Sequence, residues 1–180
     1  ELEKWSFDET RPPVINITIE GDVNIRSSIT AKMSLQVRDM EKNGRRLDEV
    51  SAEADMSGDI LTITSLRATD SRGAFQGHVD YNLQAKEGRF DVLSSLEIPP
   101  LLTAWLGLPA LRDMQIRGKQ ILNAEGEFQL NEFNVPQVQM TGHARCESVN
   151  LRGMPFDAVE LAFSWRENRV YLRDLHLIRP

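Results

Sequence analysis

The chain has 180 residues and a net charge of −6, and 41% of its residues are hydrophobic. This composition can bury one sizeable core but is too polar for a membrane protein. The lysines and arginines are scattered, which argues against a nucleic-acid surface. A single cysteine, Cys146, excludes an internal disulfide.

Alternating apolar and polar residues predict antiparallel strands through the first half of the chain. The first strand is expected from Val14 to Ile25, and the next begins at Ile29. An Asn-Gly pair within residues 41–46 is a strong hairpin signal, and a second hairpin is expected over residues 47–68. Two further strands, joined by a turn at Glu87-Gly88, bring the expected total to six or seven.

Residues 99–115 interrupt this alternation. Leucines and Trp105 recur at roughly helical spacing after Pro99-Pro100, and Gly107 with Pro109 would end a helix after about two turns. The segment is too short and too interrupted to span a bilayer. We therefore expect a short helical or coil connector that covers one end of the apolar face of the sheet.

The strand pattern then repeats. Residues 156–177 align without a gap on residues 47–68 at an offset of 109, with the same phase of alternation and the same turn position. Upstream of that hairpin, Glu125-Gly126 matches Glu20-Gly21 at an offset of 105, which requires a four-residue insertion near residues 131–136. The sequence therefore predicts a structural repeat.

This repeat divides the chain into a first copy at residues 1–98, the connector at 99–115 and a second copy at 116–180. The second copy lacks counterparts of the last two strands of the first. We therefore expect the chain either to be a segment of a longer protein or to end on an exposed sheet edge. Because it starts at Glu1 without a methionine, we also expect that an upstream part was removed.

Motifs of enzymes and metal sites are missing from the sequence, including G-x-S-x-G, the P-loop, H-E-x-x-H and C-x-x-C. The three histidines, His78, His143 and His176, fall on separate predicted strands at polar positions. We expect them to face solvent. The prediction is a protein that is not an enzyme and has no metal or cofactor.

A sheet with one apolar face must cover that face, and the chain offers little helix for the purpose. The strands must therefore cover each other, as a closed sandwich or as an open apolar groove, and the residues do not decide between these. In a groove, the lining residues would be the apolar members of the duplicated hairpin and of the strand after its first copy: Val50, Ala52, Ala54, Met56, Leu61, Ile63, Phe75, Val159, Leu161, Phe163, Trp165, Val170 and Leu172.

Two functions of different classes follow from these two geometries. An open groove would hold or conduct the acyl chains of phospholipids. A closed sandwich would be a structural or adhesion module that binds another protein through its outer face and contains no lipid.

The run GMPFDAVELAF, a short polar turn and RVYLRDLHL, followed in the first copy by RGAFQGHVDYNL, resembles the AsmA-like superfamily of bacterial envelope proteins. The resemblance covers residues 14–177 as a pattern. It implies an elongated, curved antiparallel sheet folded into an apolar groove, a periplasmic location, and an inner-membrane anchor through an N-terminal helix outside this sequence. It also implies that the chain, with the remainder of its parent protein, conducts phospholipid between the inner and outer membranes.

Overall fold

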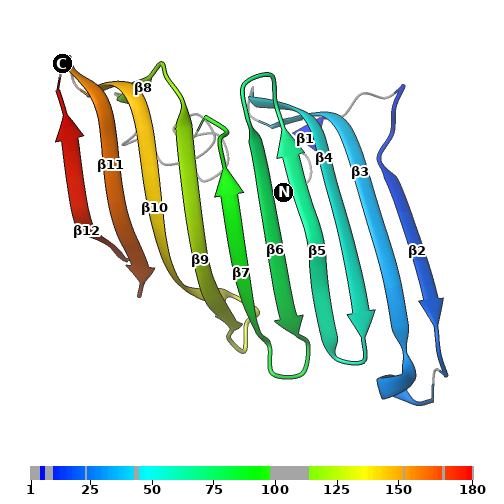
Figure 1. The fold of residues 1–180 in the computed structure, drawn as a ribbon. Helices are drawn as coiled ribbons and strands as arrows, with labels where there is room; N and C mark the ends of the chain where they lie inside the picture. Colours follow the sequence, from blue (N-terminus) through cyan, green and yellow to red (C-terminus); the bar gives the residue numbers. More distant parts are fainter. Residues whose placement is uncertain are drawn as a thin grey trace.

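The structure is a computed structural model that describes residues 5–6, 10–22, 24–42, 45–97, 114–151, 153–167 and 169–179. Within these ranges the fold is mainly β, as predicted, and consists of a single antiparallel sheet of twelve strands (Figure 1). Its elements are β1 (Trp5–Ser6), β2 (Val14–Glu20), η2 (Arg26–Ser28), β3 (Thr30–Lys42), β4 (Arg45–Ser57), β5 (Ile60–Thr69), β6 (Ala74–Asn82), β7 (Glu87–Ser94), β8 (Met114–Ile116), β9 (Gln120–Leu130), β10 (Pro136–Leu151), β11 (Met154–Arg166) and β12 (Arg169–Ile178).

The strands lie side by side almost in chain order. Strands β3 to β7 are successive neighbours, β7 pairs with β9, and β10, β11 and β12 complete the sheet. On the outer side of β3, β2 pairs with residues 30–36 and β1 with residues 41–42. The short strand β8 pairs with β10 beyond the end of β9. Both copies of the predicted repeat thus belong to one sheet, and their junction is the β7–β9 pair.

The predicted repeat is confirmed by the pairing register. Val37 pairs with Val50 in the first copy, and Cys146 pairs with Val159 at the corresponding place, 109 residues later. The β3–β4 and β10–β11 registers agree over their whole shared length, and so do those of β4–β5 and β11–β12.

Backbone irregularities repeat at the same offset. Asp39 and Ser148 both have a φ of 52°, and the register of the second hairpin shifts after Glu53 in one copy and after Ala162 in the other. Bulges of this kind bend a strand and re-aim its side chains at a defined place. Their recurrence shows that the two copies share a detailed backbone geometry, beyond a similar alternation of residues.

The predicted offset of 105 for the strand before this hairpin is wrong. Ile17 pairs with Met33, and Ala124 pairs with Gly142, which follows Met33 by 109 residues. Ile17 therefore corresponds to Ala124, at an offset of 107. Offsets that differ by two superimpose the alternation equally well, so only the pairing of a strand with its neighbour distinguishes 105 from 107.

Two strand boundaries also differ from the predictions. Strand β2 ends at Glu20, not near Ile25, because Gly21 has a φ of 130° and the chain then turns through η2. The turn between β6 and β7 precedes Glu87. It is stabilised by Asn82, whose side-chain oxygen accepts hydrogen bonds from the next backbone N–H groups, those of residues 84 and 85.

The predicted connector lies outside the described residues, except for its last two, which belong to β8.

The most buried apolar residues form two clusters at equivalent places in the two copies. The first contains Val37, Met40, Leu47 and Leu96, and the second Cys146, Val149, Phe156 and Val159. Each lies close to the turn of its first hairpin, at the same end of the sheet (top of Figure 1). The core is therefore concentrated at one end of the strands.

Cys146 is expected to react slowly with an aromatic disulfide reagent at pH 8. Its side chain is 4% exposed, and burial raises the pKa of the thiol, which lowers the population of the reactive thiolate. The measurement is the rate at which the reagent releases its aromatic thiol, with and without denaturant. A native rate equal to the rate in denaturant would contradict the buried position.

Candidate binding surface: the apolar face of the sheet

Directly paired residues form rows that cross the sheet from β2 to β12 on one face. Paired residues on neighbouring strands share a face, so each row continues from strand to strand. One row consists of Ile15, Leu35, Ala52, Leu66, Gly77, Val92, Ala124, Gly142, Phe163 and Leu172. The next consists of Ile17, Met33, Ala54, Ile63, Val79, Phe90, Gly126, Met140, Trp165 and Val170. No member of either row is polar.

All thirteen residues predicted to line a groove lie on this apolar face. Val50, Phe75, Val159 and Leu161 lie closer to the two buried clusters, and Met56 and Leu61 lie toward the opposite end. The remaining seven belong to the two rows given above. The structure thus brings together residues from both copies of the repeat on one continuous surface.

Aromatic rings on the apolar face lie across glycines. Gly88 pairs with both Tyr81 and Phe128, whose rings stack over it with centroids 5.7 Å apart. A Cβ atom added to Gly142 would meet Cζ of Phe163 at 2.6 Å and the carbonyl oxygen of Asn123 at 2.7 Å. The glycines therefore let large rings lie flat against the sheet.

Gly142→Ala is expected to lower the free energy of unfolding by about 1–3 kcal/mol, the usual cost of overpacking a well-fitted site. The ring of Phe163 and the backbone of Asn123 would both have to shift. Gly77→Ala is the matched control, because its added Cβ meets only side chains, at 3.3 Å or more. Urea denaturation measures both, and equal stability of the two variants would contradict this packing.

Exposure rises toward the two lateral edges of the apolar face. Ala124, near the middle, is 4% exposed, whereas Ile19 on β2 is 67% and Leu172 on β12 is 59% exposed. Most apolar residues between these edges are half-buried. The described face is therefore apolar surface that is only partly covered.

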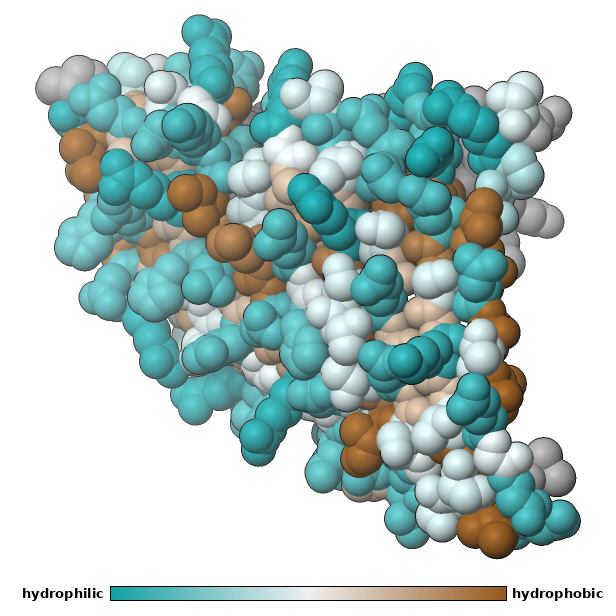
Figure 2. All heavy atoms as spheres, turned by 45° about the vertical axis from the view of Figure 1, so that its right-hand side comes forward, coloured by the Kyte–Doolittle hydropathy of each residue, from teal (hydrophilic) through white to brown (hydrophobic). Residues whose placement is uncertain are grey.

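The opposite face is polar. Figure 2 shows it covered mainly by hydrophilic side chains, with hydrophobic ones along the right-hand margin of the view and in smaller patches elsewhere. Cross-strand pairs on this face include the ion pair of Arg145 with Glu160 at 2.5 Å and the hydrogen bond from Gln36 to Glu49 at 2.7 Å. These pairs stabilise the solvated side of the sheet.

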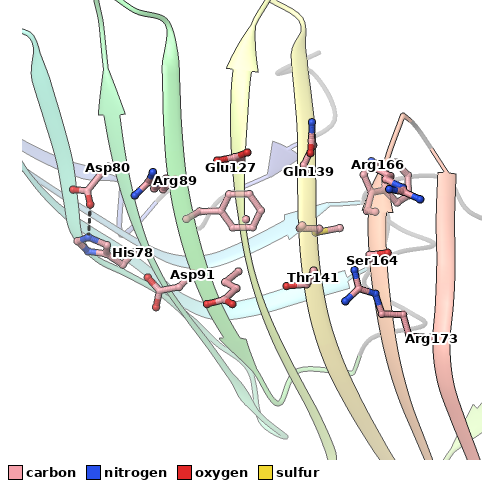
Figure 3. Close-up of a pocket in the computed structure, with 15 residues that line it drawn as sticks. His78, Asp80, Arg89, Asp91, Glu127, Gln139, Thr141, Ser164, Arg166 and Arg173 are labelled. Atoms are coloured by element: carbon pink, nitrogen blue, oxygen red, sulfur yellow. Dashed lines mark hydrogen bonds and ion pairs between the residues drawn. The ribbon is translucent and has the colours of Figure 1, made fainter.

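A hollow of about 590 Å³ lies on the polar face. Figure 3 shows its lining side chains, which come from β6 through β12: His78, Asp80, Arg89, Asp91, Glu127, Gln139, Thr141, Ser164, Arg166 and Arg173. Carboxylates lie on the β6–β9 side and two arginines on the β11–β12 side. The hollow was not predicted, because its residues lie on six strands and share no local sequence pattern.

The charged groups of this hollow interact with their neighbours. The hydroxyl of Thr62 donates a hydrogen bond to Asp80 at 2.8 Å, and this contact, with one from His78, lowers the pKa of Asp80. Arg166 lies over the ring of Tyr171, 4.7 Å from its centroid. Within the described ranges, no group of three histidine, cysteine or acidic residues could hold a metal ion. The hollow is thus a solvated depression of mixed charge.

Sequence reasoning missed part of the apolar surface. Val92 and Phe90 on β7 and Ile17 on β2 lie in the same rows as the predicted residues. Their alternation was visible in the sequence. Whether these residues extend the predicted surface depends on the β7–β9 and β2–β3 registers, which the sequence does not show.

Protein families, curated proteins and solved structures were compared with this chain, and none matches. The fold and the surface define its class: an open antiparallel sheet, built on a duplicated strand unit, with one apolar and one polar face. Among the described residues, the helical structure is too short to cross a membrane.

Proposed function

We propose that this chain is a segment of a cell-envelope protein that holds or conducts phospholipid, with acyl chains lying against the apolar face of the sheet. The observation that carries the proposal is the continuous apolar surface, whose two central rows contain no polar residue from β2 to β12. Monomeric soluble proteins rarely leave such a surface to water, and a patch of this kind marks a binding site.

The dimensions of the surface suit an acyl chain. Ten neighbouring strands at about 4.8 Å spacing make it roughly 43 Å wide. Rows repeat every second residue, about 6.6 Å apart. The two central rows and one row on each side of them, apolar except for Ser94 and Tyr81, give a height of about 20 Å. One leaflet of a bilayer has about 15 Å of hydrocarbon. Lipid tails extended along the strands would therefore remain on apolar residues over their length.

The energetics also suit a lipid carrier. Moving a methylene from water to an apolar surface gains about 0.8 kcal/mol, so ten covered methylenes contribute about 8 kcal/mol relative to water. The methylene groups of a lipid in a membrane are already shielded from water to the same extent. Exchange between the membrane and the sheet would therefore be nearly balanced, as reversible loading and release require.

The cellular setting of the proposal rests on the resemblance to the AsmA-like superfamily. In that setting the chain is periplasmic, is connected to the rest of a longer parent protein, and reaches the inner membrane through parts outside this sequence. The chain works as a lipid-holding surface and not as an enzyme. The groove that the resemblance implies would be formed by the apolar face, with the two sides of the sheet brought toward each other.

Photo-crosslinking tests where lipid binds. A benzophenone amino acid replaces either Val92 or Leu93, adjacent residues of β7 that lie on the apolar and the polar face. Val92 pairs with the small residues Gly77 and Ala124. After irradiation with phospholipid vesicles, lipid adducts are expected at position 92 and not at position 93. Adducts at neither position, or equally at both, would contradict the proposal and favour a dry structural module.

A further inference from the structure

The hollow on the polar face lies against the bulge of β12 in the second copy of the repeat. The register of β11 with β12 shifts between Ala162 and Phe163, and Arg173 is the residue left without a partner in the ladder. A bulge re-aims the side chain of its extra residue. Figure 3 shows the side chain of Arg173 directed from β12 across β11 toward β10. The bulge thus places a guanidinium group in the hollow.

The first copy has a smaller hollow, of about 350 Å³, at the equivalent place. Its lining includes three residues whose counterparts 109 positions later line the larger hollow: Lys32, Asp55 and Thr64. In the first copy a lysine is thus paired across the strands with an aspartate. In the second copy the pair is Thr141 with Ser164, and the bulge residue is Arg173. The shared fold forms either hollow, so the arginine with two hydroxyl groups is specific to the second one.

Ser164 brings a buried hydroxyl group to the larger hollow. Only 7% of this residue is exposed, and its hydroxyl forms no hydrogen bond with any residue that the structure describes. Buried polar groups nearly always have a partner, so this hydroxyl is available to a bound molecule. Arg166 and Arg173 line the same side without an ion pair to any described carboxylate. Donors of hydrogen bonds therefore converge on this side of the hollow.

The other side of the hollow is rich in carboxylates. Glu125 and Glu127 on β9 line it together with Asp91 on β7. Arg89 lies between Asp80 and Glu127 in its row, so one cation stands among four carboxylates there. Only β10 separates β9 from β11, which corresponds to about 10 Å between the two backbones. A small molecule can span that distance and contact both sides.

We propose that this hollow binds a small zwitterion that carries a phosphate group and an ammonium group. Arg166 and Arg173 bind the phosphate, and the hydroxyl of Ser164 donates a further hydrogen bond to it. The ammonium group lies beside Glu125 and Glu127. The hollow is on the face opposite the apolar surface, so this inference does not rest on the proposed function and goes beyond it.

The chemistry of the hollow favours this class of ligand. Its volume of about 590 Å³ is within the range of about 300–1,000 Å³ that is usual for small-molecule sites. Arginine binds phosphate and carboxylate oxygens through two parallel N–H donors. Two guanidinium groups and two hydroxyl groups offer more donors than a carboxylate can use, and a phosphate accepts more of them. An anion without a cationic group would be repelled by the carboxylates.

Isothermal titration calorimetry of the whole chain tests the proposal with phosphoethanolamine as the probe. Inorganic phosphate and ethanolamine, which each carry one of the two charged groups, are the controls. We expect saturable binding of phosphoethanolamine, weaker binding of inorganic phosphate and no binding of ethanolamine. Heats equal to those of dilution at millimolar phosphoethanolamine would overturn the proposal, and so would equal affinity for inorganic phosphate.

Protein variants locate the site. Arg173→Gln should weaken phosphoethanolamine binding about tenfold, the effect of losing one charge-assisted contact. Ser164→Ala should weaken it severalfold. Arg67→Gln removes the same charge from an exposed position on β5, outside the hollow, and should leave binding unchanged. Thermal unfolding checks that the three variants remain folded, and equal affinity of folded Arg173→Gln and the natural chain would overturn the assignment.

The same phosphate and ammonium groups occur on phosphatidylethanolamine headgroups, and a second arm distinguishes the two sources. Vesicles of this lipid are added to the complex with phosphoethanolamine. Displacement of the probe, with vesicle binding that is lost in Arg173→Gln, would identify the headgroups of a membrane surface as the ligand. Retention of the probe would identify a soluble phosphoester.

Discussion

Leu47→Ala is expected to lower the free energy of unfolding by about 3 kcal/mol. Leu47 is 1% exposed and packs with Val37, Met40 and Leu96 in the first buried cluster. Truncating a fully buried leucine costs about 2–5 kcal/mol, because it loses transfer free energy and leaves a cavity. Urea denaturation followed by circular dichroism measures the loss.

The repeat provides a second test of this core. Phe156 occupies the position of Leu47 in the other copy and is 4% exposed. Its replacement by alanine should cost about 3–5 kcal/mol. Leu93→Ala, on the polar face with 49% exposure, is the control and should cost less than about 1 kcal/mol. A loss at Leu93 as large as at Leu47 would mean that the assigned faces are wrong.

Phe163→Glu is expected to abolish the binding of phospholipid. The carboxylate would stand among Ala124, Gly142 and Leu172 on the apolar face, where an acyl chain could cover it only by removing the charge from water. Quantifying the phospholipid extracted from equal amounts of purified protein measures the effect.

Two controls separate this effect from unfolding. Val170→Glu places the same charge on the apolar face at a side chain already 56% exposed, so the fold should survive while lipid falls severalfold. Gln76→Glu adds the charge to the exposed polar face and should leave lipid unchanged. Equal lipid in all three folded variants would contradict binding at the apolar face.

The alternation of residues was sufficient to predict the long strands, apart from some of their ends, and the face that most of their side chains occupy. Residues such as Val50, Ala52 and Ala54 are separated by one position each, and period two places them on the same side of any strand. For the same reason the hairpin at residues 156–177 could be recognised as a copy of the one at 47–68. These patterns are local, so sequence alone carries them.

Features that depend on contacts between distant segments could not be predicted. The offset between Ile17 and Ala124 was missed by two residues, since alternation repeats at that interval. The β7–β9 junction joins strands separated by the connector, and no local pattern specifies it. The hollow on the polar face likewise needs the registers of six strands before His78 and Arg173 can be placed on one surface.

Native mass spectrometry of the purified chain, followed by extraction and identification of what is bound, tests the central proposal most directly. We expect phospholipid at a reproducible stoichiometry in the natural chain and in Gln76→Glu, and its loss in Phe163→Glu. A mass equal to that of the protein alone, under conditions that preserve a weak lipid complex added as reference, would contradict the proposal that the apolar face holds lipid.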